Sequence, residues 1–401
     1  MTFAALTDFD SASPSYATDF CDSLLSEAVT LGVSDIHLQP TAEGIEIDVR
    51  LDGVLQRVGS FPAGETALLI NRLKVMAELL TYRADVPQEG RIRNAPHDVE
   101  MRVSTFPTLY GERLVIRLFA ADRQFRQLSD LGYPGQLLDA IKSLSEATAG
   151  AFLIAGPAGS GKTTTAYAFL RSLVQADTRR SIVSLEDPIE VAVDGVAQSQ
   201  VNESTGFDLA TGLRSLVRQD PEVMMVGEIR DSETASIVYQ ASLTGHLVVS
   251  TFHAGTAAAA ITRLSDMGIE PYLLRSGTLA ILSQRLVRQL CDCSVEVSGQ
   301  EQLLDLPVDP NVTRVAAGCQ ACSGTGYHGR LVLAELLVTG PSKIGRSILQ
   351  QEDTATLQNM AVQAGMTTIA GRALQAVNDG LTSPQEVRRV LGFEERLSDQ
   401  V

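Results

Sequence analysis

The sequence lacks any long apolar run. No stretch approaches the roughly 18 consecutive apolar residues that a membrane-spanning helix needs. The first ten residues have no basic segment ahead of an apolar one, and they carry Asp8 and Asp10, so they do not form a secretory signal. These absences predict a cytoplasmic protein that reaches a membrane only by docking on a partner.

Positive charge is also in deficit. The chain has 32 Lys and Arg residues against 48 Asp and Glu residues, and its formal net charge at pH 7 is −16. Because nucleic-acid binding depends on cationic contacts with phosphate, this balance excludes a broadly basic face, and we expect no nucleic-acid partner. A locally positive site for a nucleotide and Mg²⁺ remains compatible with it. Hydrophobic residues make up 44% of the 401 residues, which excludes a disordered protein.

Cysteine is scarce, and most of it is concentrated in one region. Cys21 stands alone, whereas Cys291, Cys293, Cys319 and Cys322 occur close together in the sequence. In a reducing compartment such a cluster indicates metal binding before it indicates disulfides. We favour a metal site formed by these four cysteines, and a metal-free cluster is the alternative.

The first part of the chain combines two periodicities. Helical spacing predicts helices over residues 19–31 and from 65 to about 80, and alternation predicts a half-buried strand over 45–49. We therefore expect a smaller α+β domain over residues 1–120. A polar linker is expected over 121–127.

The rest of the chain follows a different pattern. Short apolar runs alternate with helical stretches, which is typical of strands buried on both faces of a mostly parallel sheet. These runs are 151–155, 182–185, 223–226 and 247–249. We expect an α/β domain over residues 128–288, a tetracysteine insert over 289–330 and a helical region over 331–401. Within that last region, Ser383-Pro384-Gln385-Glu386 has the pattern of a helix start.

One segment matches the phosphate-binding pattern G-x-x-x-x-G-K-[ST] in full, between a predicted strand and a predicted helix. Backbone N–H groups of such a loop cradle phosphate oxygens. Lys162 would reach the β- and γ-phosphates and the Thr163 hydroxyl would ligate Mg²⁺. A chance glycine-rich turn is the weaker alternative. The residues assigned to ATP are Gly156, Pro157, Ala158, Gly159, Ser160, Gly161, Lys162, Thr163 and Thr164.

Acidic residues follow two of the apolar runs. Glu186 and Asp187 come after 182–185, and Glu228 comes after 223–226. Carboxylates at the carboxyl ends of buried parallel strands lie at the ligand-binding edge of the sheet. We assign Glu186 to the attacking water and Glu228 to Mg²⁺, and the reverse division stays open. Each carboxylate could instead cap a helix or pair with an arginine such as Arg230.

Two histidines, His246 and His253, bracket another apolar run. A histidine in apolar surroundings is usually a core residue whose hydrogen bonds are satisfied, and no further zinc ligands stand nearby in the sequence. Sensing of the bound nucleotide is the second interpretation, and on it both histidines belong to the nucleotide site.

Together these motifs resemble the secretion and type IV pilus assembly ATPases, the hexameric motors of type II secretion and pilus extension. The resemblance runs from Ser34 to Arg389. It is carried by Ser34-Asp35-Ile36-His37, Arg50-Leu51-Asp52-Gly53-Val54-Leu55, Pro87-Gln88-Glu89-Gly90-Arg91, Arg102-Val103-Ser104, Gly111-Glu112-Arg113, and segments similar to the aspartate box (184–190), the Walker B segment (218–231) and the histidine box (244–253).

The resemblance implies a RecA-like P-loop ATPase domain, a PAS-like N-terminal domain and a C-terminal zinc knuckle with helices. It also implies a homohexamer that hydrolyses ATP at the cytoplasmic face of an inner-membrane platform protein and drives pseudopilus or type IV pilus assembly. Family arginines that reach ATP from the N-terminal domain map onto Arg50, Arg102 and Arg117. Much of the family carries an extra N-terminal docking domain, which we expect this chain to lack.

Two departures from the family pattern stand out. His253-Ala254-Gly255 replaces the usual His-Thr-Asn, and Cys291-Asp292-Cys293 is one residue tighter than the usual Cys-x-x-Cys. The cysteine cluster itself favours extension or secretion, because retraction motors lack it. Two other functions stay open: a nucleotide-binding scaffold without turnover, and a DNA-translocating or conjugation ATPase of related fold.

Overall fold

A computed structural model of the chain describes residues 3, 6, 9–10, 12–93, 99–119, 127–340 and 343–392. The chain divides into two compact units, residues 1–122 with 318–328 and residues 123–317 with 329–401. Apart from its last residue, the predicted linker 121–127 lies outside the described residues. Among the described residues, no helix is long and apolar enough to cross a membrane.

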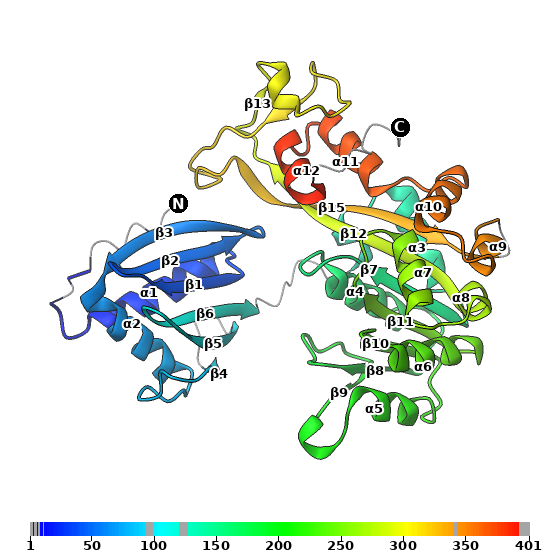
Figure 1. Cartoon of the computed structure of the whole chain (residues 1–401), viewed down its shortest axis with the longest axis horizontal. Coiled ribbons are helices and arrows are strands. Elements are labelled where there is room, and N and C mark those ends of the chain that lie inside the picture. The colour runs from blue at the N-terminus through cyan, green and yellow to red at the C-terminus, as the bar shows by residue number, and fades with distance from the viewer. Residues whose placement is uncertain are drawn as a thin grey trace. The chain divides into compact units, whose positions relative to one another are not determined.

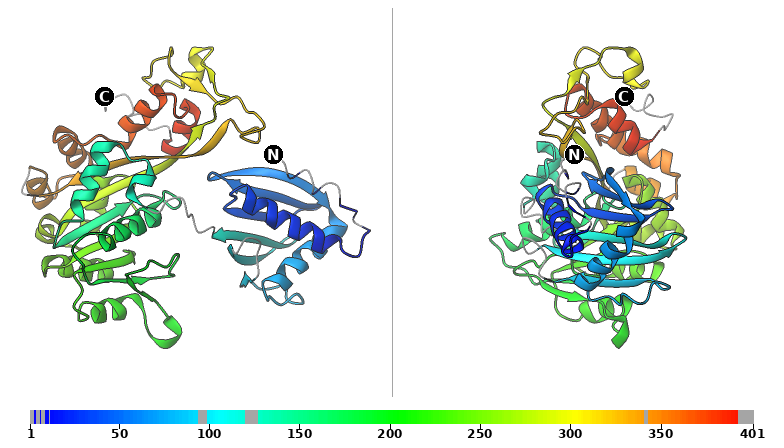
Figure 2. Two further views of the ribbon diagram at one scale, coloured as in Figure 1. Left: turned by 180° about the vertical axis from the view of Figure 1, so that it is seen from behind. Right: turned by 90° about the vertical axis from the view of Figure 1, so that its left-hand side faces the viewer.

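The N-terminal part is a six-stranded antiparallel sheet in the order β3-β2-β1-β6-β5-β4. Helices α1 and α2 pack on one face of it, because one apolar cluster contains residues of both helices and alternate residues of β1, β2, β5 and β6 (Figures 1 and 2). The elements are α1 (Tyr16–Thr30), β1 (Asp35–Pro40), β2 (Gly44–Leu51), β3 (Val54–Pro62), α2 (Ala63–Met76), β4 (Gln88–Ile92), β5 (Glu100–Thr108) and β6 (Gly111–Phe119).

Helix α2 ends at Met76, four residues before the predicted end near residue 80. Glu78 adopts a left-handed φ of 60°, and the Leu79 N–H donates to the Lys74 carbonyl over 2.8 Å. This reversal closes the helix, as such caps commonly do. Leu79 keeps the apolar periodicity but packs beside Gly90 of β4, where an added Cβ would lie 2.8 Å from Leu79.

The larger unit contains a seven-stranded sheet in the order β15-β12-β7-β11-β10-β8-β9, in which the pairs from β12 to β9 are parallel. Alternate residues of its strands belong to two different apolar clusters, so both faces are covered by helices, as the continuous apolar runs predict. Its strands are β7 (Gly150–Ala155), β8 (Ile182–Glu186), β9 (Ala197–Gln200), β10 (Val223–Glu228), β11 (Leu247–Phe252), β12 (Thr278–Leu290) and β15 (Tyr327–Val338).

Helices α3 and α4 cover one face of this sheet, and α6, α7 and α8 cover the other. The helices are α3 (Gly135–Leu144), α4 (Lys162–Val174), α5 (Leu209–Leu216), α6 (Ser232–Leu243), α7 (Ala257–Asp266) and α8 (Pro271–Gly277). Strands β13 (Val295–Glu296) and β14 (Arg314–Val315) form a separate antiparallel pair. The α/β fold predicted for this part of the chain is therefore confirmed.

The helical region was expected from residue 331, but residues 331–338 belong to β15, which pairs with β12 at the end of the sheet. The chain is helical only after residue 340, over the residues that the structure describes there. The helices are α9 (Lys343–Leu349), α10 (Thr354–Gln363), α11 (Ile369–Asn378) and α12 (Pro384–Leu391). Helix α12 starts where the sequence pattern places it, and the Ser383 hydroxyl accepts a hydrogen bond from the Glu386 N–H over 3.2 Å. The Glu386 carboxylate bonds Arg288 of β12 and Arg389, which ties α12 to the sheet.

Candidate functional site

The phosphate-loop segment connects β7 to α4, which begins at Lys162. Gly156 has a φ of 150°, and a Cβ there would lie 2.4 Å from the Ser160 hydroxyl and 2.6 Å from the Gln284 carbonyl, so only glycine fits. The Lys162 ammonium donates to the carbonyls of Gly156 and Pro157, each over 3.0 Å. Burial lowers the pKa of Lys162, and the negative charge of Glu228 opposes that shift.

Strand β12 supports this loop through one buried side chain. The Gln284 amide donates to the Ser160 carbonyl over 2.6 Å. Its oxygen accepts hydrogen bonds from the Tyr133 hydroxyl at 2.9 Å and the Thr165 hydroxyl at 3.1 Å. A buried network whose members all have partners holds a single geometry, so β12 fixes the shape of the loop. No sequence motif indicated Gln284, which comes far later in the chain than the phosphate loop.

Glu186 is the last residue of β8 and is 2% exposed. Its carboxylate accepts hydrogen bonds from the Tyr167 hydroxyl, from Ser184 at 2.5 Å and from Gln198 at 3.0 Å. Burial, together with the charge of Glu186, raises the pKa of Tyr167 well above its usual value. Sequence reasoning missed these three donors; the only available signal was a hydroxyl residue in the helix after the phosphate loop.

Glu228 ends β10, next to β8. Its two carboxylate oxygens contact His253 Nε2 and Arg230 Nε, each at 2.8 Å. Arg230 also reaches the Asp187 carboxylate at 3.3 Å. Glu228 therefore pairs with Arg230, as the alternative interpretation of these carboxylates expected. A register shift between Val226 and Glu228 changes the direction of the strand end.

The two predicted histidines lie at opposite ends of β11. In the parallel pairing with β7, Leu247 stands beside Gly150 and Phe252 beside Ala155. His246 therefore precedes the amino end of the strand, where its Nδ1 lies 3.0 Å from the Ala241 carbonyl. His253 follows the carboxyl end, on the side of the phosphate loop. At about 3.3 Å per residue the intervening strand separates the two histidines by roughly 20 Å.

The predicted arginines of the N-terminal sheet form a row on one of its faces. Arg50 and Arg117 are the register partners of Asp35, and Arg102 is the partner of Arg117. Asp35 accepts a hydrogen bond from Arg117 at 2.9 Å and pairs with Arg50 at 3.6 Å. The Arg102 guanidinium lies 4.4 Å from the centre of the Phe119 ring. Asp35 is the shared counter-ion of two of these arginines. It lies in the signature 34–37, but sequence reasoning assigned it no role.

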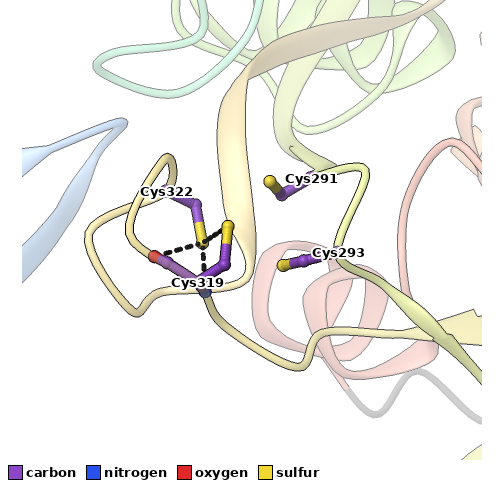
Figure 3. Close-up of side chains that lie close together, drawn as sticks. All are labelled: Cys291, Cys293, Cys319 and Cys322. Carbon is purple, nitrogen blue, oxygen red and sulfur yellow. Dashed lines mark hydrogen bonds between the residues drawn. The ribbon is translucent and has the colours of Figure 1, made fainter.

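The four clustered cysteines point toward one another (Figure 3). All four sulfur atoms lie within 4.8 Å of each other. The Cys319 and Cys322 sulfurs are 3.8 Å apart, which is about the edge of a tetrahedron with 2.3 Å Zn–S bonds. The N–H groups of Cys319 and Gly326 each donate to the Cys322 sulfur over 3.1 Å. The donor set and its spacing fit a tetrahedral thiolate metal centre.

A phosphate-loop sequence placed between a buried parallel strand and a helix, in a sheet covered on both faces, defines an α/β protein of the P-loop class. The chain belongs to the type II/IV secretion system protein family, whose sequence model matches residues 11–389. It is 42% identical over 376 residues to the type II secretion system ATPase E of Vibrio cholerae, a match that covers 92% of this chain and 74% of that protein.

Two further comparisons agree with this membership. The type IV pilus assembly ATPase PilB of Thermus thermophilus is 37% identical over 382 residues, which cover 93% of this chain and 43% of that protein. The crystal structure of the ATPase DotB of Legionella pneumophila superposes with a TM-score of 0.66 at 21% identity, over 92% of this chain and 95% of that one. The structural match supports the fold alone.

Proposed function

We propose that this chain is an ATP-hydrolysing motor that powers assembly of a type II secretion pseudopilus or a type IV pilus. One observation carries the proposal: the carboxyl ends of β7, β11, β10 and β8 lie side by side in one parallel sheet. Lys162 and His253 lie in the segments that follow β7 and β11, and Glu228 and Glu186 are the last residues of β10 and β8. A P-loop ATPase needs this combination of cation and carboxylates at the phosphate end of its sheet.

In this assignment a RecA-like domain binds ATP, with the phosphates on the backbone N–H groups of residues 156–163 and on Lys162. Thr163 and Glu228 would hold Mg²⁺, which neutralises charge that develops on the phosphate oxygens. Glu186 orients the attacking water. Its carboxylate has about four lone-pair positions, and three of them are used by Tyr167, Ser184 and Gln198. The remaining position is the one for water.

The arginine row supplies the further cations that phosphoryl transfer requires. Arg50, Arg102 and Arg117 share one face of the N-terminal sheet, so they can present three guanidinium groups to one polyanion. In this proposal the N-terminal part is a PAS-like domain that contacts the nucleotide within a homohexamer. The hexamer would act at the cytoplasmic face of an inner-membrane platform protein.

We also propose that the cysteine cluster binds one Zn²⁺, with the thiolates of Cys291, Cys293, Cys319 and Cys322 as ligands. The sulfur spacing supports it, and so do the backbone N–H groups that donate to Cys322, because such donors stabilise a coordinated thiolate. In the tight Cys-x-Cys pair, both sulfurs still lie within the cluster.

ATP hydrolysis by the purified chain tests the motor assignment. We expect Lys162→Ala to abolish turnover, whereas Lys142→Ala, which removes an exposed lysine from α3, leaves it unchanged. An unmodified chain without hydrolysis in any oligomeric state would overturn the proposal. Tight ATP binding without turnover would indicate the scaffold instead, and salt-sensitive DNA binding near physiological ionic strength would indicate the DNA-translocating alternative.

A further inference from the structure

The backbone after His253 is held from outside by three residues of other elements. The Arg285 guanidinium of β12 donates to the Gly255 carbonyl over 2.8 Å. Arg263 of α7 donates to the His253 carbonyl. The buried Glu335 carboxylate of β15 accepts a hydrogen bond from the Ala257 N–H over 2.7 Å.

Of these three residues, Arg285 is next in sequence to Gln284, the residue that supports the phosphate loop. The Gln284 side chain donates a hydrogen bond to the Ser160 carbonyl. A second N–H group of Arg285 donates to the Gln284 carbonyl over 3.1 Å. That same carbonyl approaches Gly156 so closely that a Cβ there would be 2.6 Å away. The Arg285 guanidinium thus links the Gln284 carbonyl, which packs against the phosphate loop, to the Gly255 carbonyl in the segment after His253.

The sequence explains why this link uses backbone atoms. Ala254 and Gly255 follow His253, and neither has a polar side chain with which to fix the segment. The Gly255 carbonyl accepts the hydrogen bond from Arg285, and it also accepts one from the Ser283 hydroxyl over 3.4 Å. A planar guanidinium carries donors that can reach two carbonyls at once, which a lysine ammonium on a flexible stem does not reproduce.

We propose that Arg285 is a positioning residue that keeps the His253 imidazole on Glu228, in register with the phosphate loop. The inference rests on the proposed ATPase function, because Glu228 is assigned there to Mg²⁺. His253 Nε2 lies 2.8 Å from the Glu228 carboxylate. A shift of the backbone at Gly255 moves that contact directly, since only Ala254 separates the two residues.

The electrostatics agree with this placement. Lys162 has a lowered pKa, mainly through burial, and the positive charge of Arg285 adds to that lowering. Arg285 therefore lies within electrostatic range of the phosphate-loop lysine.

The test compares Arg285→Met and Arg285→Lys with Arg171→Gln, a control that removes a positive charge from the last turn of α4. ATP affinity, the kcat of hydrolysis and the imidazole NMR signal of His253 are measured in the full chain. The chain has only five histidines, so the loss of one signal in His253→Gln assigns it.

We expect Arg285→Met to lower kcat about 10- to 100-fold, which corresponds to the loss of charged hydrogen bonds, while ATP affinity changes less than about threefold. The His253 signal should shift in the same variant. Arg285→Lys should recover part of kcat, and Arg171→Gln should match the unmodified chain. An unshifted His253 signal with normal kcat would overturn the proposal. So would a large loss of ATP affinity at unchanged kcat, which would make Arg285 a direct phosphate ligand.

Two further outcomes are distinguishable. If Arg285→Met does not fold, Arg285→Lys and the His253 signal still decide the matter, because the lysine variant retains the charge but not the two-carbonyl contact. If the unmodified chain does not hydrolyse ATP, the proposed function fails. The shift of the His253 signal then still tests the positioning role by itself.

Discussion

Replacement of Glu186 by Gln tests the assignment of the attacking water. The substitution keeps the size of the side chain but removes its charge and converts one acceptor oxygen into an NH₂ donor. Three donors surround the carboxylate, from Tyr167, Ser184 and Gln198, and the side chain is buried. If the new NH₂ group takes the place of the oxygen bonded by Ser184 and Gln198, it faces the Gln198 NH₂ group, which can only donate. If it takes the place of the other oxygen, the Tyr167 hydroxyl must accept instead of donating.

The magnitude has two components. Loss of one hydrogen bond to a buried charged group costs about 1.5–3 kcal/mol of stability. Loss of a group that orients or deprotonates water lowers turnover about 10²- to 10⁴-fold. Because Glu186 is assigned to the attacking water and not to the phosphates, ATP affinity should stay close to that of the unmodified chain. Glu228→Gln should instead raise the Mg²⁺ concentration needed for half-maximal hydrolysis.

The assay is steady-state hydrolysis with a Mg²⁺ titration and a thermal melt for each variant. Tyr167→Phe keeps the carboxylate and removes one donor, so we expect a smaller loss of turnover than in Glu186→Gln. Glu233→Gln, at an exposed position of α6, is the matched control. Full turnover in Glu186→Gln together with none in Glu228→Gln would refute the division and exchange the two roles.

Two further predictions concern other parts of the chain. Elemental analysis should find about one Zn²⁺ per chain, lost in Cys293→Ser but kept in Cys21→Ser, and a clean zero in metal-replete protein ends that assignment. Glu386→Ala should lower the free energy of unfolding by about 3–5 kcal/mol, because it leaves Arg288 without its buried partner. Burial favours a higher pKa for Glu386, but hydrogen bonds from Arg389 and Arg288 outweigh it and lower that pKa. The stabilisation is therefore present above about pH 4.3 and lost in acid; chemical unfolding of both proteins against pH checks this, and an equal difference at low pH would contradict it.

Local pattern predicted much of the fold. The alternation in β2, the continuous apolar runs of the parallel strands and the helix start at Ser383 each appear where the sequence places them, because they depend on residues close along the chain. The end of α2 was less predictable. Its apolar periodicity continues through Leu79, but the left-handed backbone at Glu78 places this leucine in a turn, where it packs beside Gly90 of β4.

The sequence by itself indicated the residues that we propose for the chemistry: the phosphate-loop residues, Glu186, Glu228 and the four cysteines all lie in short motifs whose spacing is local. Tertiary structure alone decided their partners. His246 and His253 look equivalent in sequence, yet they lie at opposite ends of a six-residue strand, and only His253 is on the side of the phosphate loop. Gln284 and Arg285 belong to no motif, and they reach the phosphate loop and the His253 segment because parallel pairing puts β12 beside β7. Ser160 and Gln284, for example, are joined by a hydrogen bond although more than 100 positions separate them in the sequence. No local pattern encodes such a contact.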